Sequence, residues 1–208
     1  MQTLKNILVG FLVSFIGSIP LGYLNVIGFE IYNQQSLKPT LLYLFGVVFI
    51  EFFVIYFTLT FANVLAVNKK ITKYIQAFSV LFMFVLAGVF YFSSNTNIDF
   101  TSSFNYSPFA LGIVLSCLNF MQIPFWIGWN VYLLNGKYIE VSKTKNYFYV
   151  FGTVMGTFFG MLVLILSLHY FAANVKFVAK YLTQIIIPLV FLTLGIFQAI
   201  KFYKKYLK

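Results

Sequence analysis

The chain has 208 residues, of which 61% are hydrophobic and only 9% are charged. A soluble domain carries about 25% charged residues, so this composition excludes an ordinary soluble protein and indicates one integral membrane domain over residues 1–208. The net charge of +10 comes from 14 basic residues, all lysine. Because these lysines lie almost wholly between or beyond the apolar runs, they indicate membrane topology and not nucleic-acid binding.

Six apolar runs follow one another along the chain, at 6–32, 39–67, 75–92, 108–134, 147–172 and 183–201. Their lengths match or exceed the roughly 20 residues that a helix needs to cross the hydrocarbon layer. The first run has no small-residue cleavage site and contains Pro20, Asn25 and Glu30, so we expect a retained helix and not a signal peptide. The sequence therefore predicts an all-α integral membrane protein with six transmembrane helices.

The lysines are distributed unevenly between the two sides of this predicted bundle. Eleven lie at the two termini and in the second and fourth loops, and three lie in the other loops. Because cytoplasmic segments carry the excess of lysine and arginine, both termini are predicted to be cytoplasmic. We expect a multi-pass protein of the bacterial plasma (inner) membrane, in contact with the lipid bilayer.

The two halves of the sequence, approximately 1–92 and 108–208, can be aligned at offsets of 104 to 107 residues. The aligned pairs are 43–53 with 149–159, 84–90 with 191–197, Pro20 with Pro124, and Asn25 with Asn130. Each half contains three predicted spans, so the second half must enter the membrane from the opposite face. The sequence therefore predicts two inverted three-helix repeats, an arrangement typical of secondary transporters that alternate between inward-open and outward-open states.

A proline near the middle of the first span and another in the fourth predict two broken helices. A proline inside a helix removes one backbone hydrogen bond and collides with the preceding turn. In lipid the freed groups need a neighbour, water or a ligand, and paired breaks indicate a substrate site. The predicted substrate-binding residues are Ser18, Pro20, Asn25, Asn119, Gln122, Pro124, Trp126 and Asn130. The alternatives are packing kinks and interhelical hydrogen bonds, which are worth about 0.6 kcal/mol each.

Glu51 lies near the centre of the second predicted span, and no lysine shares its depth. An ionised carboxylate there costs at least about 2.5 kcal/mol, so the neutral acid is favoured. Glu51 is therefore predicted to couple transport to proton movement, and Thr157 takes its place in the second half. The alternative is a permanently protonated acid bonded to a neighbouring helix.

Two stripes of small residues recur at four-residue spacing and predict close helix packing within the bundle. They are Gly10, Ser14, Ser18 and Gly22, and Gly152, Gly156 and Gly160. A seam between two copies, which would make a homodimer, is the alternative. The single cysteine, Cys117, excludes an internal disulfide, and His169 has no second histidine, cysteine or aspartate nearby in sequence, so neither a metal site nor a cofactor is expected.

Two segments resemble elements of the LysE/RhtB amino acid exporters. They are Gly17-Ser-Ile-Pro-Leu-Gly-Tyr-Leu-Asn25 and Leu118-Asn-Phe-Met-Gln-Ile-Pro-Phe-Trp126. The family's first element usually reads Pro-Gly-Pro, whereas here Pro20 is alone, and its second has proline directly after asparagine, where this chain has Phe120. The resemblance implies a divergent member that exports amino acids or related small solutes, driven by the proton gradient.

The expected function is therefore a secondary transporter with a small, amino acid-like substrate, and not an enzyme. An exporter of inorganic or divalent cations from the same superfamily is the first alternative. It predicts several intramembrane acids, whereas in this sequence only Glu51 lies deep in a predicted span. A membrane-embedded enzyme or thiol-electron conduit would need paired cysteines or clustered His, Asp and Glu. A purely structural membrane subunit is the remaining alternative.

Overall fold

In the computed structural model the described residues are all helical or lie in short links between helices, and they include no strand. They are 2–19, 22–62, 107–120, 122–140, 142, 145–174, 185 and 187–206, with eleven separate residues between 70 and 88. The helices are α1 (Gln2–Ser18), α2 (Tyr23–Gln35), α3 (Leu37–Thr60), α7 (Pro108–Leu118), α8 (Gln122–Asn135), α9 (Lys145–Asn174) and α11 (Ile187–Tyr206). The predicted all-α class is confirmed.

Two of these helices, α3 and α9, are long and apolar enough to cross a membrane, over Leu37–Thr60 and Lys145–Phe171. The count rises to four within the described part of the chain if α1 with α2, and α7 with α8, each form one bent span. The predicted run 75–92 lies mostly outside the described residues, and the run 183–201 overlaps α11.

Each of the two proline-containing runs is divided into two helices. The axes of α1 and α2 differ by 76°, and those of α7 and α8 differ by 70°. Pro124 is the third residue of α8, so the chain breaks before this proline and not at it. In the first turn of a helix the absent N–H costs no helical hydrogen bond, which explains why the break comes first. Pro20 lies outside the described residues.

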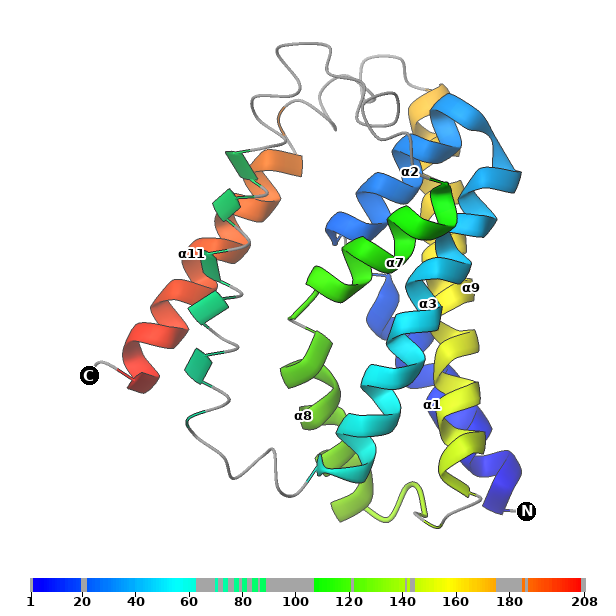
Figure 1. Cartoon of the computed structure of the whole chain (residues 1–208), viewed down its shortest axis with the longest axis vertical. Coiled ribbons are helices and arrows are strands. Elements are labelled where there is room, and N and C mark those ends of the chain that lie inside the picture. The colour runs from blue at the N-terminus through cyan, green and yellow to red at the C-terminus, as the bar shows by residue number, and fades with distance from the viewer. Residues whose placement is uncertain are drawn as a thin grey trace.

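The helices α1, α2 and α3 form one group and α7, α8 and α9 a second, and corresponding helices of the two groups run in opposite directions (Figure 1). From the end that holds the N-terminus, α1 and α2 run to the other end and α3 returns. By contrast, α7 and α8 run in the direction of α3, and α9 returns beside α1. In this view α11 stands apart from the bundle of α1, α3, α7, α8 and α9.

Glycines bring α1 and α9 into backbone contact. A Cβ atom added to Gly10 would lie 2.6 Å from the carbonyl oxygen of Tyr149, and one on Gly160 would lie 2.7 Å from that of Phe15. Gly152 likewise faces the backbone of Ile7. The two predicted stripes of small residues therefore pack against each other within one chain, as expected for close helix approach.

A second glycine seam joins α3 to α7. A side chain on Gly46 would collide with the backbone of Phe109, and one on Gly112 would collide with the carbonyl of Tyr43. With these two seams, the α1–α9 pair and the α3–α7 pair are each held at a distance that only glycine permits.

Two hydrophobic clusters lie at opposite ends of the bundle. The cluster under α8 consists of Ile55, Leu59, Trp126, Leu133, Ile139, Tyr149 and Val150. The cluster under α2 consists of Ile31, Tyr43, Leu44, Val47, Met161 and Ile165. Since α3 and α9 contribute to both, these two helices form the common support on which α2 and α8 are placed.

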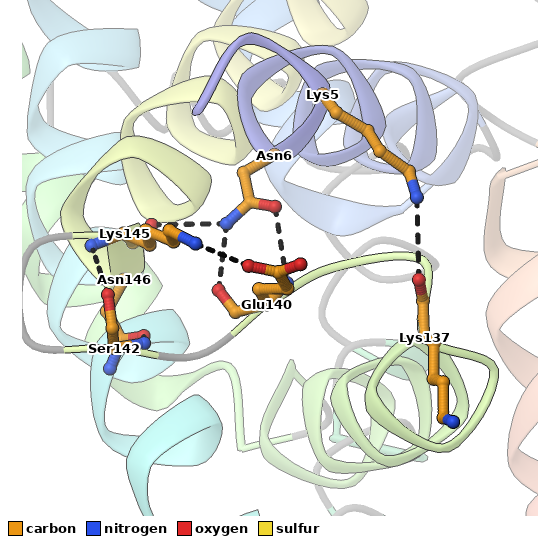
Figure 2. A network of polar contacts seen from close by, with 7 residues as sticks. All are labelled: Lys5, Asn6, Lys137, Glu140, Ser142, Lys145 and Asn146. Atoms are coloured by element: carbon orange, nitrogen blue, oxygen red, sulfur yellow. Dashed lines mark hydrogen bonds and ion pairs between the residues drawn. The ribbon is translucent and has the colours of Figure 1, made fainter. Parts of the chain in front are cut away.

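A polar network fixes the N-terminal end of α1 to the link between α8 and α9 (Figure 2). The buried amide of Asn6 donates to the carbonyls of Glu140 at 3.0 Å and Lys145 at 3.4 Å, and its oxygen accepts from the Glu140 N–H at 3.3 Å. The side chains of Lys145 and Glu140 form an ion pair, and Lys5 donates to the carbonyl of Lys137. One side chain thereby satisfies three backbone groups of the link.

Replacing Gly112 by alanine should destabilise the protein by about 1–3 kcal/mol, because the new methyl group collides with the α3 backbone. The matched control is Gly128→Ala in α8, where a Cβ would meet nothing within 4 Å. Thermal unfolding in detergent micelles measures the difference. Equal stability of the two variants would contradict the close contact of α3 with α7.

Candidate functional site

The carboxyl group of Glu51 lies at the junction of several helices. It projects from α3, its residue is 8% exposed, and its Oε1 accepts a hydrogen bond from Trp126 Nε1 of α8 at 3.1 Å. Among the described residues, Lys145 and Glu140 form an ion pair, and Glu51 is not part of one. A buried carboxyl with a neutral donor and no cation beside it is in a setting that favours the protonated acid.

The second carboxyl oxygen, Glu51 Oε2, is buried and makes no hydrogen bond with the described residues. The hydroxyl of Thr157 on α9 lies near the carboxyl, and Thr157 Oγ1 is 2.5 Å from Ser14 Oγ of α1. These four residues, Ser14, Glu51, Trp126 and Thr157, come from α1, α3, α8 and α9, and we call them the central polar cluster. All four are buried.

Side-chain amides span both helix breaks. At the first break, Asn25 Nδ2 of α2 donates to the carbonyl of Ser18, the last residue of α1, at 3.0 Å. At the second, Gln122 Nε2 of α8 donates to the carbonyl of Ser116 near the end of α7 at 2.9 Å. Each amide donates to a carbonyl in the last turn of the helix before the break, and the Ser116 carbonyl also accepts from the Asn119 N–H at 3.1 Å. The breaks are therefore stabilised from within the chain.

Asn130 has its own partners at the end of the bundle that holds α8. Its Nδ2 donates to Thr58 Oγ1 at 3.2 Å, and its Oδ1 accepts from the Tyr149 hydroxyl at 2.9 Å. The residue is fully buried. Asn130 thus makes interhelical hydrogen bonds to α3 and α9.

The predicted site residues thus fall into separate groups. The structure brings Glu51 together with Trp126, and it pairs Asn25 with Ser18, but it places Asn130 in a different network. Asn119 and Pro124 are half-buried at the second break. Sequence reasoning left out Ser14, Ser116, Thr157, Thr58 and Tyr149 from the site. Thr157 carried a signal, since it aligns with Glu51, and so did Ser14 and Ser116, which are hydroxyl residues of the two broken spans.

A groove runs along one face of α8 next to the cluster. It has a volume of about 440 Å³ and is lined by Phe125, Gly128, Trp129 and Tyr132. Phe125 packs edge-on against Trp126, and a Cβ on Gly17 would lie 2.9 Å from the Phe125 ring, so the groove starts beside the end of α1. Its volume is within the range of about 300–1,000 Å³ that small-molecule sites occupy. We call it the aromatic groove.

Comparison of the chain with protein-family models, with curated proteins and with solved structures found no match.

Asn130→Ala should lower the free energy of unfolding by about 1–3 kcal/mol, because it leaves the Tyr149 hydroxyl without its acceptor and removes the donor to Thr58 Oγ1, whose own bond to the Val54 carbonyl remains. Tyr149→Phe should cost less, and the double variant should cost less than the two together, because both remove the same bond. Tyr132→Phe, at an exposed hydroxyl, is the control. Additive losses in a denaturation series in mixed micelles would contradict the network.

Proposed function

We propose that the protein is a multi-pass secondary transporter of the bacterial inner membrane that exports amino acids or related small solutes by alternating access. Glu51 takes up and releases the coupling proton. The observation that carries this proposal is a buried carboxyl without a cationic partner among the described residues, placed where helices from both halves of the chain meet beside a broken span. Intramembrane acids are costly, and proton relays are one of their main uses.

The glycine seams support the inverted repeat on which alternating access depends. Gly10 of α1 meets the carbonyl of Tyr149, and Gly112 of α7 meets the carbonyl of Tyr43. Tyr43 and Tyr149 are 106 positions apart, which is the offset of the sequence alignment, and the two glycines are 102 positions apart. Equivalent residues therefore make equivalent contacts in the two halves.

The reciprocal contacts follow the same two offsets. Gly152 of α9 faces the carbonyl of Ile7, and Gly46 of α3 faces that of Phe109. Gly46 and Gly152 are 106 positions apart, and Ile7 and Phe109 are 102 positions apart. Together with the opposite running directions of the helices, this supports two halves related by an axis in the membrane plane.

The hydrophobic clusters repeat in the same way. Tyr43, Leu44, Met161 and Ile165 in the cluster under α2 correspond, at the offset of 106, to Tyr149, Val150, Ile55 and Leu59 in the cluster under α8. Each end of the bundle is thus closed by the same kind of contact, made once with α2 and once with α8. Two near-equal ends of this kind are what exchange between inward-open and outward-open states requires.

The substrate is proposed to pass along the two breaks and the aromatic groove. Polar groups near the breaks, among them Ser18, Asn119 and Gln122, suit the amine and carboxylate of an amino acid, and the groove suits its apolar part. Trp126 links the two regions, because its ring contacts Phe125 of the groove and its N–H binds Glu51. Substrate entry beside Trp126 would then act directly on the carboxyl.

The proposed topology, with both termini in the cytoplasm, predicts a labelling pattern. In a Cys117→Ser background, Gln35→Cys at the end of α2 should react with a membrane-impermeant maleimide in intact cells. Lys208→Cys should react only after the cells are permeabilised. The parent variant without cysteine is the control. Labelling of Lys208→Cys, and not of Gln35→Cys, in intact cells would show that the orientation is the opposite of the one proposed.

Transport in proteoliposomes tests the function itself. A panel of labelled amino acids is assayed with and without a pH gradient for the wild type and for Glu51→Gln, whose amide resembles the protonated acid. We expect the gradient to drive transport by the wild type, and we expect Glu51→Gln to retain exchange of substrate but to lose at least about tenfold of the gradient-driven rate, because it carries no transferable proton.

The matched control is Glu140→Gln, which removes an exposed carboxylate in the α8–α9 link. Its gradient-driven rate should equal that of the wild type. Unchanged gradient-driven transport in Glu51→Gln would refute proton coupling by this residue. Absence of transport for every amino acid in the wild type would refute the proposed substrate class and favour the export of inorganic cations.

A further inference from the structure

Ser14 and Ser116 occupy equivalent positions in the two halves. They are 102 positions apart, the same offset that relates Gly10 to Gly112 and Ile7 to Phe109 in the glycine seams. Each serine lies one turn after its glycine, on the face that packs against the long helix of the other half. Both serines are buried, with Ser14 1% exposed and Ser116 0% exposed.

The residues that face these two serines are equivalent as well. Ser14 Oγ lies 2.5 Å from Thr157 Oγ1, which also donates to the carbonyl of Thr153 at 3.3 Å. The position of Thr157 in the first half is that of Glu51, and the position of Thr153 is that of Val47. A Ser116 contact with Glu51 would thus be the counterpart of the Ser14 contact with Thr157.

The structure shows the two serines in different arrangements. Ser116 Oγ does not bind Glu51 but donates to the carbonyl of Val47, one helical turn earlier, at 3.2 Å. Glu51 uses Trp126 instead, and its Oε2 has no hydrogen-bond partner among the described residues. A long side chain on a helix leans toward the preceding turn, and Val47, which accepts the bond from Ser116, lies in the turn that precedes Glu51.

Resting on the transport function proposed above, we propose that Ser116 is a positioning residue for Glu51, whose hydroxyl donates to Oε2 in the opposite conformation of the transporter. In the conformation described here the Trp126 indole donates to Oε1, Oε2 makes no hydrogen bond with the described residues, and the carboxyl receives the proton. In the opposite conformation Ser116 turns from the Val47 carbonyl to Oε2, and the carboxylate left by proton release is stabilised by a second donor.

The proposed exchange requires a change of side-chain rotamer at Ser116. A serine hydroxyl changes partner by rotation about χ1 between staggered wells, without movement of the backbone. The Val47 carbonyl it leaves remains the acceptor of the hydrogen bond within α3 from the residue one turn later, as in any α-helix.

The test is the pH profile of gradient-driven transport in proteoliposomes for Ser116→Ala, Ser116→Thr and a control. Without the Ser116 hydroxyl, the carboxylate is less stable at the release step, so Glu51 keeps its proton to a higher pH. We therefore expect the acid limb of the profile to move upward by about one pH unit in Ser116→Ala. Ser116→Thr retains the hydroxyl and should restore the wild-type profile.

Thr40→Ala is the matched control, because it also removes a buried hydroxyl that donates to a backbone carbonyl, but three turns away from Glu51 on α3. Its profile should match that of the wild type. If Ser116→Ala does not fold, Ser116→Cys keeps the volume with only a weak donor, and it should shift the acid limb in the same direction by a smaller amount.

The role of Ser116 would be refuted by an unshifted acid limb in Ser116→Ala, or in Ser116→Cys if only that variant folds. This conclusion applies when the wild type shows proton-driven transport and Glu51→Gln abolishes it. An equal shift in Ser116→Thr and Ser116→Ala would refute the role too, because the effect would then come from packing. If Glu51→Gln left gradient-driven transport unchanged, the proposed function itself would be refuted. The two failures are therefore distinguishable.

Discussion

The arrangement of this protein depends on direct backbone contact at two glycine seams. At Gly112 and Gly152 the neighbouring helix occupies the space where a side chain would begin. Without water inside a membrane to drive helices together, close van der Waals packing of this kind is a main source of attraction between them. The seams bind α1 to α9 and α3 to α7, so each half of the chain is held by the other half and not only by itself.

The same seams determine where polar groups can lie. Because α1 and α9 approach so closely, only small side chains such as Ser14 and Thr157 fit between them, and these meet at 2.5 Å. Glu51 lies at the edge of this contact, where α8 supplies Trp126. Its position is thus a consequence of backbone packing, and the polar centre would separate if the seams widened. A buried carboxyl with few donors is sensitive to each of them.

The sequence predicted much of this arrangement where the signal is local. Small residues at four-residue spacing predicted close packing by the helices that carry them, though not that α1 and α9 are partners, and the two prolines predicted the divided spans. The sequence did not place the second break correctly in relation to Pro124, because a proline restricts the residues before it while it is tolerated in a first helical turn. Nor did it give the partners of Asn130, since Thr58 and Tyr149 are brought near only by the packing of α3 and α9 against α8. An amide in a sequence carries no information on whether it binds a ligand or another helix.

The two halves correspond in their seams but differ at two polar contacts. Tyr43 donates to the backbone carbonyl of Leu24 in α2, whereas its counterpart Tyr149 donates to the side chain of Asn130 in α8. A carboxyl at position 51 is likewise matched by a hydroxyl at position 157. Two identical carboxyls at the contact would repel each other when ionised, and two hydroxyls would carry no proton. One acid opposite one hydroxyl gives a centre with a single proton that both conformations of the proposed transporter can use, so the asymmetry between the halves is what makes coupling to one proton feasible.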